Sequence, residues 1–193
     1  MKKNRKLKII FIVVLLGLFA LLFYGAKDIY DTLNENDSPY FKKLFEKLKD
    51  VLESDEVDEE EYATLMSKLF VVDFYSLKYA ISKSDVGGIQ FVYSDYQDTF
   101  TTKAKDTVYA YVKSNVYGKR KQDLPNIKSI KVTNIEQKEY DGDKVQDDEA
   151  YYVELEITYD EDLDYPTTAS LILVHDDKKL EVVEMTSPIE ETE

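Results

Sequence analysis

The sequence contains no cysteine and no tryptophan, and it has a single histidine, His175. Without cysteine the chain forms no disulfide, has no catalytic thiol and offers no cysteine–zinc site. It also lacks a Gly-x-Ser-x-Gly turn, a Walker loop, a Rossmann fingerprint and a His-Glu-x-x-His helix. We therefore expect a protein that is not an enzyme and that binds no cofactor.

Positive charge is scarce outside the N-terminus. Residues 1–8 hold five cations and no acid, whereas the formal net charge of the chain is −14. Because residues 9–26 carry no charge, subtracting these cations leaves −19 for residues 27–193. Such an acidic segment repels polyanions, which argues against nucleic-acid partners and against docking on anionic lipid.

The longest apolar run is residues 9–26, eighteen residues without a charge. As a helix it would span roughly 27 Å, close to the hydrocarbon thickness of a bilayer. The positive-inside rule places residues 1–8 in the cytoplasm and the acidic remainder outside the cell. The sequence thus predicts a single-pass cell-membrane protein whose membrane contact is this anchor.

A cleaved signal peptide is the alternative interpretation of the same residues. Cleavage after Ala26 would put the bulky Tyr24 where a small residue is required. The apolar run is also longer than the 7–15 residues of an ordinary signal sequence. Both features favour an uncleaved anchor.

Beyond the anchor we expect a spacer (residues 27–37), one α+β domain (residues 38–186) and an acidic tail (residues 187–193). Ser38 and Pro39 suit the start of a helix, as capping hydroxyl and first helical residue. Apolar residues then recur every three or four positions and predict a helix over roughly 39–53: Phe41, Leu44, Phe45, Leu48, Val51 and Leu52.

Two more helices are predicted. The acidic run 54–61 suits the start of a helix that continues into the apolar run 69–80 and lies at the centre of the core. A third helix should begin at the Ser94-x-x-Gln97 capping box and continue to Tyr117, where Gly118 ends it. The cations 119–121 would then face the negative end of its dipole.

After residue 125 the apolar period changes from 3.6 to 2, which predicts strands. One strand is expected around Ile130 and Val132, followed by Tyr151–Tyr159, Ala169–Val174 and Leu180–Met185. Short polar connections favour an antiparallel meander with one face packed on the helices.

Three helices followed by such a meander, behind an anchor, resemble the nuclear transport factor 2-like (cystatin-related) domain. Among anchored versions, the architecture resembles the assembly subunits of type IV secretion and Gram-positive conjugation systems. Residues 85–93 (DVGGIQFVY) and 118–125 (GKRKQDLP) are also similar to segments of Firmicute membrane proteins. The resemblance implies a curved, cone-like four-stranded sheet around a long helix. The partners expected for such a domain are other cell-envelope proteins or further copies of the chain itself.

Some enzymes of this fold use an aspartate in the cone, which makes Asp73 a candidate catalytic residue by resemblance. His175 is a candidate general base, although a turn position beside Asp176 and Asp177 favours a solvated side chain. Asp141, Asp143 and Asp147 are candidate calcium ligands, but their spacing lacks the EF-hand pattern, and solubilising hairpin acids explain them better.

Sixteen tyrosines suggest a recognition surface, because tyrosine buries a large amphipathic face at low entropy cost. The pattern predicts exposure for some of Tyr109, Tyr117, Tyr152 and Tyr165. Three hypotheses follow: an interaction scaffold of an envelope assembly, a module for an apolar or peptide ligand, and a cone enzyme that uses Asp73. The sequence favours the scaffold.

Overall fold

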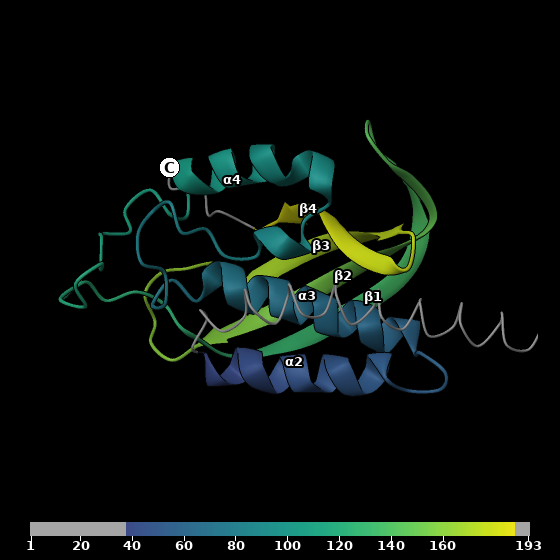
Figure 1. Cartoon of the computed structure of the whole chain (residues 1–193), viewed down its shortest axis with the longest axis horizontal. Coiled ribbons are helices and arrows are strands. Elements are labelled where there is room, and N and C mark those ends of the chain that lie inside the picture. The colour runs from purple at the N-terminus through teal and green to yellow at the C-terminus, as the bar shows by residue number, and fades with distance from the viewer. Residues whose placement is uncertain (1–37, 188–193) are drawn as a thin grey trace, which may run out of the picture. The chain divides into compact units, whose positions relative to one another are not determined.

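A computed structural model describes residues 38–187, which form one α+β unit with three α-helices followed by a four-stranded antiparallel meander (Figure 1). This coarse architecture confirms the prediction. The elements in chain order are α2 (Pro39–Leu52), α3 (Glu59–Tyr75), the 3₁₀ turns η1 (Ile89–Phe91) and η2 (Ser94–Tyr96), α4 (Gln97–Asp106), β1 (Ile127–Asp141), β2 (Gln146–Tyr159), β3 (Thr168–Asp176) and β4 (Lys179–Thr186).

Several predictions concern residues outside the described part of the chain. They are the cytoplasmic tail (residues 1–8), the anchor (residues 9–26), the spacer (residues 27–37) and nearly all of the acidic tail. Within residues 38–187, no helix is both long enough and apolar enough to cross a bilayer.

The first two helices begin at side-chain caps. The Ser38 hydroxyl accepts a hydrogen bond from the backbone N–H of Phe41 at 3.4 Å, and Pro39 is the first residue of α2, as predicted. At α3, the Asp58 carboxylate accepts from the N–H of Glu61 at 3.0 Å. Three glutamates in the first turn of α3 then face the positive end of its dipole.

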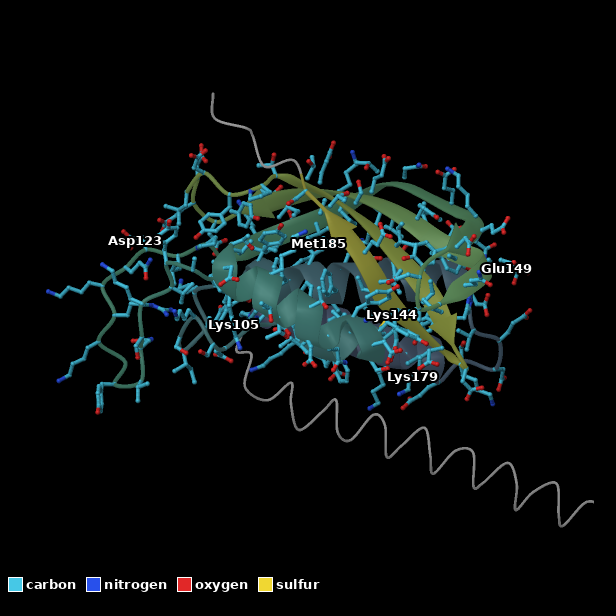
Figure 2. All side chains as sticks on the ribbon, turned by 90° about the horizontal axis from the view of Figure 1, so that it is seen from above. Lys105, Asp123, Lys144, Glu149, Lys179 and Met185 are labelled. Carbon is cyan, nitrogen blue, oxygen red and sulfur yellow. The ribbon has the colours of Figure 1, made fainter. Side chains whose placement is uncertain are left out.

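Helix α3 is the centre of the domain, as its nearly continuous apolar sequence predicted. Most of its residues from Tyr62 to Tyr75 are buried, and it contacts all four strands. Figures 1 and 2 show the helices on one face of the sheet, with α2 and α4 on either side of α3. The Phe100 ring of α4 lies 5.7 Å from Phe70 and 5.2 Å from Phe74, measured between ring centroids, so aromatic rings fill the contact between α3 and α4.

The strands pair in sequence order, β1-β2-β3-β4. Strand β2 alternates as predicted, with Leu155 and its inward neighbours buried against the helices and Glu154 and Glu156 exposed on the outer face. The first two strands are longer than predicted, so residues expected in a loop belong to β1 and β2. A register shift between Lys138 and Tyr140 bends this hairpin.

The bent hairpin contributes a second, smaller apolar cluster. Tyr140, Ala150 and Val174 are buried there, and Tyr152 packs against them. The hairpin end also reaches η2, because the Tyr96 hydroxyl donates to the Asp143 carboxylate at 2.6 Å. The cluster stabilises the β1–β2 hairpin, which the sequence pattern predicted to be a polar, solvent-exposed connection.

The third predicted helix is shorter than expected. It ends at Asp106 rather than at Tyr117, and Ser94 belongs to η2, so the predicted capping box does not form. The Thr107 hydroxyl donates to the carbonyl of Lys103, and the chain then turns. Tyr111, which lies within the bounds of the predicted helix, follows α4 and is exposed.

The burial of Leu155 provides a test of the sheet register. Leu155→Ala should lower the free energy of unfolding of the segment from Ser38 to the C-terminus by about 2–5 kcal/mol, because it leaves a cavity beneath β2. The matched control is Glu154→Ala on the opposite face, which should change it by less than about 0.5 kcal/mol. Urea unfolding measures both values, and equal effects would mean that the faces of β2 are misassigned.

Candidate functional site

Asp73, the candidate catalytic aspartate, is half-buried on α3 and binds the loop that follows it. Its Oδ2 accepts from the backbone N–H of Gly88 at 2.7 Å and from the side-chain amide of Gln90 at 2.8 Å. A Cβ on Gly87 would lie 2.2 Å from the Asp73 carbonyl oxygen, so only glycine permits this approach. These contacts give the carboxylate a structural role in holding residues 87–90 against α3.

Tyr109 was a candidate for an exposed recognition residue, and this prediction is wrong because only 1% of the residue is exposed. Its hydroxyl donates to the carbonyl of Phe74 at 2.7 Å and accepts from the N–H of Gly87 at 3.0 Å. Burial raises the pKa of this phenol well above its ordinary value. Tyr109 therefore binds the end of α3 to the same glycine loop that Asp73 holds.

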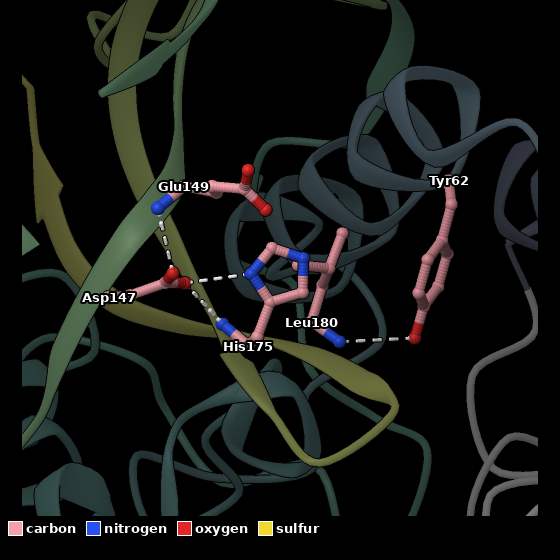
Figure 3. Close-up of polar contacts among 5 residues, drawn as sticks. All are labelled: Tyr62, Asp147, Glu149, His175 and Leu180. Atoms are coloured by element: carbon pink, nitrogen blue, oxygen red, sulfur yellow. Dashed lines mark hydrogen bonds and ion pairs between the residues drawn. The ribbon is translucent and has the colours of Figure 1, made fainter. Parts of the chain in front are cut away.

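His175 lies in β3 rather than in the turn where the sequence placed it, and it forms a pair with Asp147 of β2 (Figure 3). Asp147 Oδ2 accepts from the backbone N–H of His175 at 2.7 Å and lies 2.8 Å from its ring nitrogen Nδ1. The carboxylate also accepts from the N–H of Glu149 at 2.9 Å. The pair joins the ends of two neighbouring strands.

The Asp147 side chain is 10% exposed, and burial alone would disfavour its charge. The N–H groups of His175 and Glu149 outweigh that cost, and the net effect lowers the pKa of Asp147. Sequence reasoning missed this pair because its members are far apart in the chain. It also missed Glu181, whose Oε2 is buried without a hydrogen-bond partner among residues 38–187 and whose pKa is raised by burial.

The three candidate calcium ligands do not come together. Asp143 binds the Tyr96 hydroxyl, Asp141 accepts from the side-chain amide of Gln146, and Asp147 binds His175. In residues 38–187, no group of three or more histidine, aspartate or glutamate side chains is placed to hold a metal ion. The extension of β1 and β2 separates these acids, because alternate strand residues point to opposite faces.

The other tyrosine candidates differ in environment. Tyr152 is half-buried beside the cluster of the bent hairpin, with its hydroxyl donating to the carbonyl of Glu139. Tyr165 is also half-buried, with its ring 6.3 Å from Tyr159. Tyr117 is 87% exposed, which confirms the prediction for this residue, and Tyr111 is 85% exposed.

Both exposed tyrosines belong to residues 107–122, which we call the basic loop. This loop contains four cations and no acid. The Arg120 guanidinium donates to the carbonyls of Ala80 (2.6 Å), Lys78 (2.8 Å) and Lys113 (3.2 Å). The expected interaction of residues 119–121 with a helix dipole is therefore wrong, because α4 ends at Asp106 and Arg120 instead binds carbonyls that follow α3.

Three more hydrogen bonds stabilise the basic loop. The N–H of Asn115 donates to the carbonyl of Ile81 at 2.7 Å, and the side chain of Gln122 bonds to the backbone of Lys113 (2.9 Å) and Tyr111 (3.1 Å). The loop thus holds its conformation while Tyr111 and Tyr117 point into solvent. It is the candidate functional site of the described domain.

Comparison of the chain with family models, with curated proteins and with solved structures found no match.

The structural role of Asp73 is testable by its removal. Asp73→Ala should lower the free energy of unfolding by about 1–3 kcal/mol, because the N–H of Gly88 and the amide of Gln90 lose a buried acceptor. Asp98→Ala, at an exposed position of α4, is the control and should change it by less than about 0.5 kcal/mol. An Asp73→Asn protein more stable than the parent would contradict this role, since carboxylates of active sites are kept at a cost in stability.

The lowered pKa of Asp147 predicts a loss of stability in acid. A carboxylate with a lower pKa in the folded state stabilises the fold above its unfolded pKa of about 3.9, and this contribution disappears as the pH falls through the folded value. Asp147→Asn should therefore cost about 1–2 kcal/mol at pH 7, and the difference from the parent should shrink toward zero in strong acid. Urea unfolding across this pH range measures the difference in stability between the two proteins. A difference that stays constant with pH would refute a stabilising role for the charge of Asp147.

Proposed function

We propose that this protein is a membrane-anchored interaction module of a bacterial cell-envelope assembly, with the described domain outside the cell. The basic loop carries this proposal. It exposes two tyrosines on a backbone that Arg120, Asn115 and Gln122 hold in place. A loop that is ordered before binding loses little entropy when a partner docks, so its aromatic side chains contribute more to affinity.

The anchor hypothesis rests on the sequence of residues 9–26 and on the basic residues before it. The observed α+β architecture is compatible with a cone-like, nuclear transport factor 2-like domain and with assembly subunits of secretion or conjugation systems. The cone-like domain type and the role in such an assembly remain parts of the proposal.

Two observations favour the scaffold over the alternatives. Phe70, Phe74 and Phe100 pack against each other, so aromatic rings and not an open cavity occupy the contact between α3 and α4. Asp73, the residue on which an enzyme would depend, binds the backbone N–H of Gly88. An interaction surface on the outside of the domain requires neither an internal ligand nor a reactive carboxylate.

The proposal predicts that Tyr117 touches another protein chain in intact cells. Replacing Tyr117 by the photoreactive benzoylphenylalanine, also an aromatic residue, should yield crosslinked products larger than the monomer on irradiation. The same substitution at Thr158, exposed on the outer face of the sheet, is the control and should yield at least about tenfold less. Products of equal yield at both positions, or none at Tyr117, would contradict an interaction surface at the basic loop.

A further inference from the structure

Large apolar side chains are exposed in two places on the described domain. One group lies in or beside the basic loop and the other in or beside the connection between α2 and α3. The first group is Ile81, Tyr111, Val116 and Tyr117; the second is Leu52 and Val57. Within residues 38–187, no other large apolar residue is exposed to this degree.

The two groups lie among opposite charges. The basic loop has four cations and no acid, whereas residues 53–61, which we call the acidic segment, have seven acids and no cation. Every residue of the acidic segment is exposed. The dipole of α3 accounts for the glutamates in its first turn, but it does not account for Leu52 and Val57 in solvent.

The two surfaces lie at opposite ends of the domain. In Figure 1 the connection between α2 and α3 is at the right end of the helix layer, and the loops after α4 are at the left. In Figure 2, Asp123 and Lys105 mark the loop end, and Glu149 and Lys179 mark the other. Burial raises the pKa of Tyr151, and the negative charges of Glu59, Glu60, Asp58 and Glu149 raise it further, so the acidic segment lies at the Glu149 end.

We propose that the basic loop of one copy docks on the acidic segment of a second copy, head to tail. This inference rests on the proposed function and names the partner of the same loop. Each surface combines exposed apolar side chains with a charge complementary to the other, so contact would bury apolar area and pair Lys119 and Lys121 with acids. Because the two surfaces differ, a docked pair leaves a free basic loop on one copy and a free acidic segment on the other, and the contact can repeat from copy to copy.

A second copy fits better than the other candidate partner, an anionic bilayer surface. The acidic charge of the domain repels anionic lipid and a second copy alike, so the local features of each surface decide between them. The chain itself supplies an acidic surface with exposed apolar residues, which a lipid headgroup layer does not offer at a fixed spacing. Copies held in one membrane also meet at a high effective concentration, so a weak contact suffices.

Crosslinking between introduced cysteines tests the proposal, because the chain has none of its own. Full-length copies with Val57→Cys and copies with Ser114→Cys, distinguished by tags, are co-expressed in one membrane and treated with a short bis-maleimide. A product between position 57 of one copy and position 114 of another is expected. Copies with the same single cysteine should crosslink at least about tenfold less, since a head-to-tail contact keeps like positions apart.

Charge reversal in the same assay tests complementarity. On the Ser114→Cys copies, Lys119→Glu with Lys121→Glu should reduce the product between positions 57 and 114 by about tenfold. Adding Asp55→Lys with Glu56→Lys on the Val57→Cys copies should restore the product. The control reverses two exposed lysines of α2, Lys43→Glu with Lys47→Glu, and should leave the product unchanged. Reduction by the control, or no restoration by the compensating pair, would refute the proposed contact.

The result at Tyr117 separates failure of this inference from failure of the proposed function. If the photoreactive residue at position 117 captures only other proteins and the cysteine product is absent, the interaction module stands and self-docking is wrong. If that residue captures nothing and the cysteine product is absent, both are wrong. If the residue at position 117 crosslinks to lipid and the cysteine product is absent, the loop binds lipid and self-docking is wrong.

Discussion

The burial of α3 on almost all sides is the constraint on which the rest of the domain depends. A helix with apolar residues around most of its circumference is stable only when other elements cover every side. The sheet covers one side with β1 to β4, and α2 and α4 lie along its flanks. The loop after α3 must then return across its C-terminal end, which is where Asp73 and Tyr109 bind the Gly87–Gly88 turn. The basic loop is attached to this same end through Arg120.

The sequence predicted those parts of the fold that follow from local periodicity. The first helix, the central position of α3, the alternation of β2 and the meander all agree with the structure, because each depends on apolar spacing within one element. The errors lie where distant residues compete with the local pattern. The helical pattern made Tyr109 a candidate for an exposed residue, yet its hydroxyl binds the carbonyl of Phe74, 35 residues earlier in the chain. Asp147 was expected in a polar loop, yet it binds His175, 28 residues later.

The candidate site was predicted only in part for the same reason. Tyr117 is exposed as expected, since nothing in the sequence offers it a partner. The importance of the surrounding loop depends on Arg120, whose guanidinium binds carbonyl groups about 40 residues away. Read locally, residues 119–121 were only a cation cluster at a helix end. The two candidate catalytic residues show the converse. Asp73 and His175 stood out in the sequence, but Asp73 binds the backbone N–H of Gly88 and His175 pairs with Asp147.

Net charge and local charge lead to different conclusions for this chain. A net charge of −19 on residues 27–193 implies that copies repel at long range, which keeps a soluble form dispersed. Salt at physiological strength reduces that repulsion beyond about 8 Å, whereas a contact between the basic loop and the acidic segment would act at shorter distances. Free copies would then associate weakly, and confinement to one membrane would supply the concentration that the contact lacks. The proposed anchor and the charge pattern would then act together, because the acidic surface would suppress association except between copies held in one membrane.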